Sequence, residues 1–268
     1  MKPVISVIIP CFNEEECLPT LLEELEKVIN ILDSKYSTEV LVIDDHSNDR
    51  TSEILTANEE KYSWLNYIRV LKNQGSHVAN YVGLKFCKGK WAFVIGADMQ
   101  ARPEILVDFI KKAEEGHKLI LGQRVGRNDP LYKKIPSAIF NQMMARFVIK
   151  GFPLEGGDVF LIDRVLIDAV IDCKEKNINI FVLLLSLCSD FVTVPYHRYH
   201  RFAGESKWTN SKLIKLAYDS IISVSLLPIK VMFWIGAASF GFSILLSFYI
   251  IVKRLQGAIT VEGWTSLL

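Results

Sequence analysis

Residues 39–49 read EVLVIDDHSND, an apolar run that ends in a cluster of polar side chains. The run has the length and the β-branched content of a buried strand, and Ser47 and Asp49 are residue types that favour the start of a helix. Similar apolar runs alternate with amphipathic stretches, which predicts an α/β fold with a mostly parallel sheet covered by helices. The predicted strands are 4–10, 39–44, 67–71, 91–96 and 118–123, and helices are predicted at 14–32, after Asp49, from about Ser76 and from near Pro103.

Polar residues follow four of these strands, in segments 10–15, 44–49, 96–100 and 122–127. Ligands of open parallel sheets bind outside the carboxyl ends of the strands. Any one segment alone is better explained by ordinary loop and capping chemistry, but four at one sheet edge favour a ligand site. No Walker loop and no GxGxxG motif follows a strand, which argues against the common nucleoside-triphosphate and dinucleotide sites.

The composition narrows the class of protein further. The 268 residues include 31 Lys and Arg against 30 Asp and Glu, a formal charge of +1 that does not fit an electrostatic nucleic-acid binder. Half the residues are hydrophobic, which excludes intrinsic disorder. The five cysteines form no CxxC pair, so we expect neither a disulfide framework nor a zinc site, and a reducing compartment fits.

Residues 231–252 read VMFWIGAASFGFSILLSFYIIV, 22 residues without a charge. At roughly 1.5 Å per residue such a helix spans about 33 Å, enough to cross the apolar core of a bilayer. We therefore predict a transmembrane helix, with a buried helix of a soluble core as the alternative.

The orientation of that helix is predicted from the other end of the chain. The apolar run 4–10 is too short for a signal peptide, so the N-terminal domain is expected in the cytosol, at the cell (inner) membrane. Lys207, Lys212, Lys215 and Lys230 agree with the positive-inside tendency, whereas Lys253 and Arg254 weaken it.

Residues 209–227 place an apolar stripe opposite Lys212, Lys215 and Asp219, which is typical of a helix in the membrane interface. A helix packed on the soluble domain is the alternative. The predicted organisation is a cytosolic domain at 1–205, an amphipathic juxtamembrane helix at 206–229, a transmembrane helix at 230–254 and a tail at 255–268. The tail turns apolar at GWTSLL and either starts a second transmembrane helix or touches the interface.

The chain resembles glycosyltransferase family 2, and within it the membrane-anchored polyprenyl-phosphate glycosyltransferases. The segments VISVIIPCFNEE, VIDDHSNDRT, NQGSH, ADMQARPE, GGDVFLIDR and GESKWT occur in the order typical of that group. The resemblance implies an A-type glycosyltransferase fold at 1–205. It also implies a cell-envelope hexosyltransferase that moves one sugar from a nucleotide sugar, with uracil as the expected base, to polyprenyl (undecaprenyl) phosphate with inversion.

The resemblance also assigns a donor site. Asp98 matches the last aspartate of the DxD motif, which holds Mg²⁺ or Mn²⁺ on the donor diphosphate. The first aspartate of that motif is Gly96 here, and Ala101 replaces an acidic residue often found after Gln100. More of the coordination must then come from phosphate, water or another side chain such as Asp158. The residues expected to line the nucleoside pocket are Pro10, Phe12, Glu14 and Asp45.

The proposed acceptor, a lipid phosphate, is largely dianionic at neutral pH because its second pKa is about 6, so it needs little help from a general base. Cations must instead let two anionic substrates approach. We assign Asp158, Asp98, Arg124 and Arg127 to catalysis, and Arg198, Arg201 and Lys207 to the acceptor phosphate. Asp158 matches the position often assigned as the base, but orienting a substrate or sharing the metal is at least as well supported. The alternatives are a turn aspartate and a solvated basic surface.

Two other functions remain open at this point. A processive polysaccharide synthase of the same fold is disfavoured, because the sequence has no QxxRW motif and one clear span. A non-catalytic nucleotide-sugar binder or membrane scaffold is suggested by Gly96. The oligomeric state is open, a homo-oligomer included. The histidines carry no recognisable metal spacing, and His77 is expected to be a hydrogen-bonded histidine.

Overall fold

A computed structural model describes residues 2–125, 142, 158–173, 179–202 and 227–256. The chain divides into two units, residues 1–224 and 225–268. The predicted juxtamembrane helix at 206–229 and the tail at 257–268 fall mostly outside the described residues, so the domain boundaries of the sequence analysis remain predictions.

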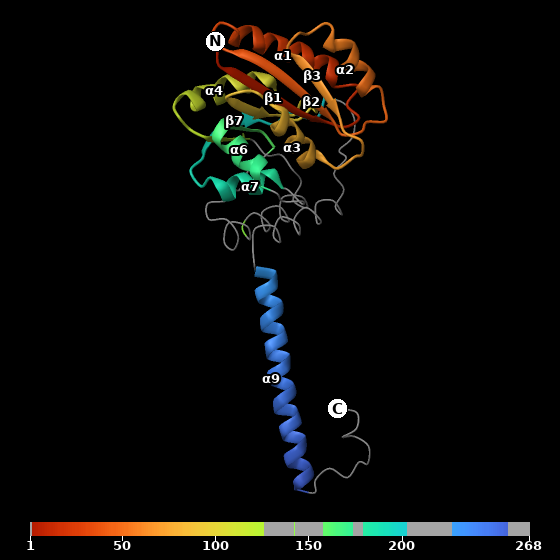
Figure 1. The fold of residues 1–268 in the computed structure, drawn as a ribbon, viewed down its shortest axis with the longest axis vertical. Coiled ribbons are helices and arrows are strands. Elements are labelled where there is room, and N and C mark those ends of the chain that lie inside the picture. Colours follow the sequence, from red (N-terminus) through yellow and green to blue (C-terminus); the bar gives the residue numbers. More distant parts are fainter. Residues whose placement is uncertain (1, 126–141, 143–157, 174–178, 203–226, 257–268) are drawn as a thin grey trace. The chain divides into compact units, whose positions relative to one another are not determined.

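The first unit is built on a seven-stranded sheet with the order β3-β2-β1-β4-β6-β5-β7 (Figure 1). Six strands run in one direction, and β6 is antiparallel to both of its neighbours, so the prediction of a mostly parallel sheet is confirmed. The strands are β1 (Val4–Cys11), β2 (Ser37–Asp44), β3 (Leu65–Arg69), β4 (Trp91–Val94), β5 (Leu119–Val125), β6 (Phe160–Asp163) and β7 (Val192–His197).

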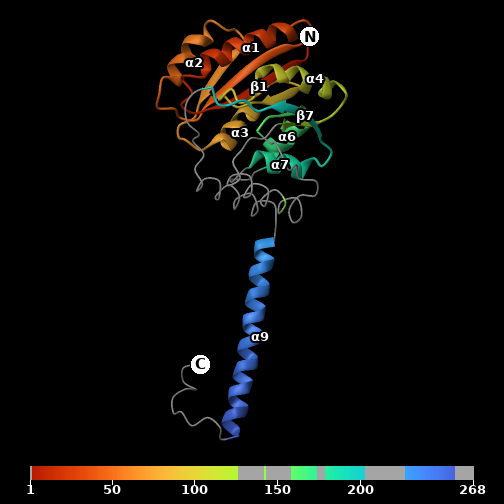
Figure 2. The same cartoon turned by 180° about the vertical axis from the view of Figure 1, so that it is seen from behind.

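Helices cover both faces of this sheet (Figure 2). One face packs against α1 (Leu18–Leu32), α2 (Thr51–Glu59), the short 3₁₀ helix η1 (Pro103–Ile105) and α4 (Leu106–Glu114). The other packs against α3 (Ser76–Phe86), α6 (Arg164–Asp172) and α7 (Ile180–Leu187). A strand buried on both faces must be apolar at every position, which explains the near-continuous apolar runs of β1 and β2.

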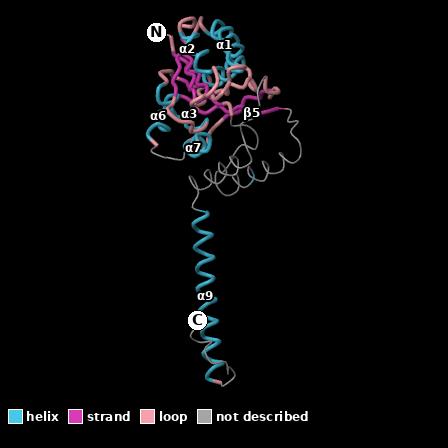
Figure 3. Tube along the Cα trace, turned by 90° about the vertical axis from the view of Figure 1, so that its right-hand side faces the viewer, coloured by secondary structure: helices cyan, strands magenta, loops and turns pink. Residues whose placement is uncertain are grey.

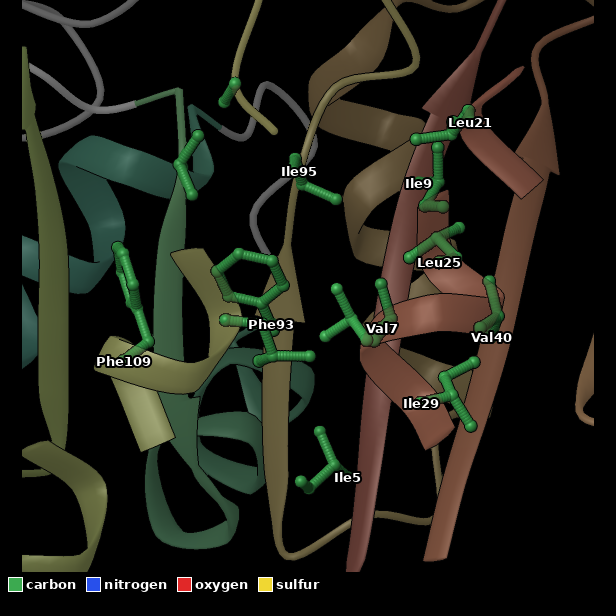
Figure 4. Packing of buried hydrophobic residues seen from close by; sticks show 14 of the residues in the cluster. Ile5, Val7, Ile9, Leu21, Leu25, Ile29, Val40, Phe93, Ile95 and Phe109 are labelled. Carbon is green, nitrogen blue, oxygen red and sulfur yellow. The ribbon is translucent and has the colours of Figure 1, made fainter. Parts of the chain in front are cut away.

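Successive residues of β1 serve the two cores in turn. Ile5, Val7 and Ile9 lie in the cluster with α1 and α4, whereas Ile8 lies in the cluster with α3 and α6. Figure 4 shows the first cluster, in which these three side chains meet Leu21, Leu25 and Ile29 of α1 and neighbour Val40 and Phe93.

The contact between α3 and β1 requires a glycine. A Cβ on Gly83 would lie 2.3 Å from Cγ2 of Ile8, closer than two carbon atoms can pack. Gly83 therefore lets α3 lie against the sheet, and this sets the position of the polar loop that precedes α3.

The predicted strands are found with small shifts. Strand 67–71 is two residues early, because its pairing with β2 ends at Asp44 and Arg69. The helix predicted from residue 14 begins at Leu18, because the backbone N–H of Glu14 donates to Oγ1 of Thr51 instead of joining a helix. Elements β6, α6, α7 and β7 were not predicted.

The second unit contains one long helix, α9 (Leu227–Leu255; Figure 3). Among the described residues it is the helix long and apolar enough to cross a membrane, at Ile229–Leu255. Its large apolar side chains are exposed, including Met232, Trp234 and Phe240. This helix coincides with the predicted transmembrane segment and is a candidate span.

Candidate functional site

The chain turns sharply at the carboxyl ends of β1, β2 and β4. Asn13, His46 and Met99 have positive φ angles of 53°, 63° and 57°. Side chains other than glycine rarely adopt this left-handed region, and such strained positions concentrate at functional sites. The strand order changes direction on either side of β1, which is where open sheets bind ligands. The three strained residues therefore frame the predicted site.

Hydrogen bonds join the loop after β1 to the loop after β2. Each loop supplies both donors and acceptors, so the two cannot shift independently. The side chains of Glu15 and Asp49 are engaged within this frame, since they accept backbone N–H groups of the opposite loop or its flank. The bonds are Asn13 N to Ser47 Oγ (2.8 Å), Asn48 N to Asn13 Oδ1 (2.8 Å), Glu15 N to Asp49 Oδ2 (3.2 Å) and Arg50 N to Glu15 Oε2 (3.0 Å).

Asp45 positions the start of α3. Its two carboxylate oxygens accept the backbone N–H groups of Gln74 (2.8 Å) and Gly75 (2.7 Å). Gly75 has a φ of 90°, which suits glycine, and α3 begins at the next residue. Burial raises the pKa of Asp45, although the two N–H bonds act against the rise. The residue predicted for the nucleoside pocket thus lies at the site edge and also holds its loop together.

Asp98 lies in the turn after β4 and is half-buried. Its Oδ1 accepts the backbone N–H of Gln100 at 3.2 Å. A Cβ at Gly96 would lie 3.4 Å from the same Oδ1, so an aspartate at position 96 would place a second carboxylate beside Asp98. The sequence therefore offers one carboxylate where the related motif has two.

The fit of a divalent metal depends on that single carboxylate. Among the residues that the structure describes, no three His, Cys, Asp or Glu side chains could hold a metal ion together. Mg²⁺ commonly binds through one or two carboxylates, with the remaining ligands from substrate phosphates and water. Asp98 fits this second kind of site, in which the ion is shared with a bound diphosphate.

Arg201 and Glu14 form a close ion pair at this edge. Both side chains are largely buried, with 18% and 10% of their surface exposed. Burial alone lowers the pKa of Arg201, but the hydrogen bond and charge of Glu14 outweigh it, and the charge of Asp98 adds to them, so the pKa rises above its usual value. A residue predicted for the acceptor phosphate thus meets two residues predicted for the donor.

The segment after β7 also lies on the loop after β4. The Arg198 guanidinium donates to the side-chain carbonyl of Gln100, and the backbone N–H of Tyr199 donates to the backbone carbonyl of Gln100 at 3.0 Å. The Arg102 guanidinium stacks on the Tyr199 ring at 4.5 Å. Gln100 therefore connects the predicted acceptor side to the turn that carries Asp98.

Arg124 and Asp158 form a second ion pair. Arg124 lies near the end of β5, opposite Tyr196 of β7, and Asp158 lies two residues before β6. The Arg124 side chain is 18% exposed, whereas Asp158 is 58% exposed. The structure thus brings two predicted catalytic residues together, and Asp158 is oriented by a cation.

The remaining predicted residues divide into two groups. Pro10 and Phe12 lie at the end of β1 and just after it, both half-buried. Arg127 and Lys207 lie outside the described residues.

His77, in contrast, does not match its expectation, since it forms no hydrogen bond with any residue in the described part of the chain. Burial lowers its pKa to about 4, so the ring is neutral at pH 7. It lies in the first turn of α3, where it packs without a polar partner.

Sequence reasoning missed the contacts of Gln100, Arg102 and Tyr199. Gln100 stands inside the ADMQARPE segment, and that position was the available signal. The stacking of Arg102 on Tyr199 joins residues almost a hundred positions apart, which no local pattern indicates.

The sheet and the polar loops at its carboxyl edge are those of an A-type glycosyltransferase fold. Glucosyl-3-phosphoglycerate synthase from Mycobacterium tuberculosis, crystallised with Mn²⁺, UDP and glucosyl-3-phosphoglycerate, aligns with a TM-score of 0.55. The alignment covers 82% of this chain and 77% of that one at 17% identity, which supports the fold alone.

The chain belongs to glycosyl transferase family 2, whose sequence profile matches residues 6–170. It is 30% identical, over 98% of its length and 81% of the relative, to an uncharacterised glycosyltransferase of Bacillus subtilis named YkcC. It is also 30% identical to the undecaprenyl-phosphate 4-deoxy-4-formamido-L-arabinose transferase of Yersinia enterocolitica, over 94% of this chain and 76% of the relative. The expected family and the expected enzyme class are confirmed.

Proposed function

We propose that this enzyme transfers a single sugar from a UDP-sugar to polyprenyl phosphate, with inversion, at the cytosolic face of the inner membrane. The observation that carries the proposal is the contact of Arg201 with Glu14 beside Asp98. It joins the segment assigned to an anionic acceptor to the loops assigned to a nucleotide donor. The Yersinia relative, which is named for an undecaprenyl-phosphate substrate, supports the acceptor class.

The donor side follows from the carboxyl edge of the sheet. Pro10, Phe12 and Asp45 stand where the nucleoside would lie, and Asp98 would hold a divalent cation together with the donor diphosphate. When bound, that cation would neutralise charge on the departing nucleoside diphosphate. The fold neighbour crystallised with Mn²⁺ and UDP supports this donor and metal class.

In the proposed reaction, a phosphate oxygen of the lipid attacks the anomeric carbon of the sugar. The new bond is carbon to phosphate oxygen, and the bond to the nucleoside diphosphate breaks, with its electron pair leaving on the diphosphate oxygen. The dianionic phosphate has no proton to lose, so no general base is needed. Arg124, Arg198 and Arg201 offset the repulsion between the two anions. Asp158, held by Arg124, orients the sugar or the acceptor.

The apolar helix α9 supports a membrane setting for this reaction. A lipid phosphate lies at headgroup depth, and a juxtamembrane helix at 206–229 would keep the site at that level. The cytosolic face is proposed from the chain's basic residues before α9 and from the cytosolic supply of nucleotide sugars that such a donor site needs.

Purified full-length protein in detergent tests the proposal directly. Incubation with undecaprenyl phosphate, Mn²⁺ and a panel of nucleotide sugars should give a lipid phosphate carrying one sugar, detected by mass spectrometry. Products with several sugars would favour the processive synthase. Nucleotide binding without any product across the panel would favour the non-catalytic binder and contradict the proposal.

A further inference from the structure

The side chains of Glu14, Asp98 and Arg201 form a mixed-charge cluster where the loops after β1 and β4 meet the segment after β7. Glu14 is 9% exposed and is ion-paired with Arg201. Asp98 is near enough for its charge to raise the pKa of Arg201. One guanidinium therefore serves two carboxylates, and only Glu14 has it as a direct partner.

The charge of this cluster is unusual for a site that binds a divalent metal. Two carboxylates and one guanidinium give a net charge of −1, and the positive charge lies beside the single metal-binding candidate. A resident cation near a carboxylate repels an incoming metal ion, and it does so strongly where water is largely excluded.

Gly96 fits the same arrangement. An aspartate at that position would start 3.4 Å from Asp98 Oδ1 and would raise the negative charge of the cluster by one. A site with two adjacent carboxylates would bind a divalent metal in the presence of Arg201. With glycine there, Asp98 alone must choose between the guanidinium and a metal ion.

We infer that Arg201 is an internal counter-ion that competes with the divalent cation for Asp98, and that Glu14 is the positioning residue that keeps Arg201 in reach. The inference rests on the proposed function, because it concerns the metal that would accompany the donor diphosphate. When metal and donor arrive together, Asp98 exchanges Arg201 for the metal. The guanidinium is then available to the anionic phosphates of the substrates, so metal binding and phosphate binding are linked through one side chain.

The competition predicts an effect of opposite sign to that of a metal ligand. Full-length protein in detergent, without nucleotide or lipid, is titrated with Mn²⁺ and followed by electron paramagnetic resonance. Arg201→Gln should bind Mn²⁺ about tenfold more tightly than the parent, because the repelling charge is gone. Gly96→Asp should tighten Mn²⁺ binding as well. Unchanged or weaker binding by a folded Arg201→Gln protein would overturn the inference.

Matched variants separate competition from general effects. Arg102→Gln removes a positive charge from the loop after β4, but Arg102 stacks on Tyr199 and should leave Mn²⁺ affinity within about twofold. Asp98→Asn should abolish the tightening in the Arg201→Gln background, and a tightening that persists there would contradict the role of Asp98. If Arg201→Gln does not fold, Arg201→Met replaces the buried guanidinium by a neutral apolar chain and should give the same tightening.

The Mn²⁺ titration needs neither donor, acceptor nor turnover. It can therefore succeed while the transfer assay fails, which would reject the proposed function alone. A productive transfer assay with no tightening in Arg201→Gln or Arg201→Met would reject the competition alone.

Discussion

Arg201 and Glu14 lie 187 residues apart in the chain and form an ion pair at the carboxyl edge of the sheet. The pair closes the site from two sides, because Glu14 belongs to the first loop of the fold and Arg201 to the segment after its last strand. Removing one partner of a buried ion pair leaves an uncompensated charge, which costs more than the pair contributes.

Glu14→Gln should therefore act on the acceptor rather than on the nucleotide. We expect kcat/KM for the lipid phosphate to fall at least about tenfold, while UDP affinity stays within about threefold, because the variant loosens the hold on Arg201. Glu16→Gln is the matched control, since Glu16 is exposed and should behave as the parent. A large loss of UDP affinity in Glu14→Gln would instead assign Glu14 to the nucleoside pocket.

Asp98→Asn should lower kcat by about a hundredfold or more, since it removes the carboxylate expected to share the metal with the donor diphosphate. Chelation of divalent ions should lower the parent's rate and have little further effect on the variant. Rates are measured with radiolabelled donor at saturating lipid. An Asp98→Asn enzyme that keeps both its rate and its metal dependence would place the metal elsewhere.

The rate should rise through about pH 6, as the lipid phosphate becomes a dianion, and Asp158→Asn should keep that profile at a lower rate. An aspartate held by Arg124 orients a substrate, so its loss should lower kcat without moving the midpoint. Disappearance of the acidic limb in Asp158→Asn would show that Asp158 acts as a general base.

His77 makes stability depend on pH. Its pKa is about 4 in the folded protein against an ordinary value of 6.5, so the unfolded chain binds the extra proton first as the pH falls. Stability from this residue is complete above about pH 7 and is lost between about pH 6.5 and pH 4. His77→Gln should flatten the decline of Tm over that range, measured in detergent. An equally steep decline in the variant would show that other groups cause it.

Gly83→Ala should destabilise the fold by about 1–3 kcal/mol, because the new methyl group would overlap Ile8 and push α3 away from β1. Thermal or denaturant unfolding of the detergent-solubilised protein measures this. Lys85→Ala, on the exposed face of the same helix, controls for the change in helix propensity and should be nearly neutral. Equal stability of the two variants would contradict the close packing at Gly83.

The sequence predicted the first five parallel strands because each is an apolar run bounded by polar residues. It missed β6, which has only four residues, and α7, whose sequence IFVLLLSL is apolar on every face and shows no helical period. In β7, Pro195 conceals a strand that tolerates proline because it lies at the sheet edge.

The candidate site was predictable in part for a related reason. Residues that follow strands, such as Asp45 and Asp98, are marked by local sequence. The pairing of Glu14 with Arg201, and of Arg124 with Asp158, depends on how distant segments return to the sheet, and no local pattern encodes it.

Mass spectrometry of the polyprenyl phosphates from cells that make this protein, compared with cells that make its Asp98→Asn variant, tests the central claim most directly. The account predicts a polyprenyl phosphate carrying one sugar in the first sample and its absence in the second. Identical lipid profiles in the two samples, with both proteins present in the membrane, would contradict it.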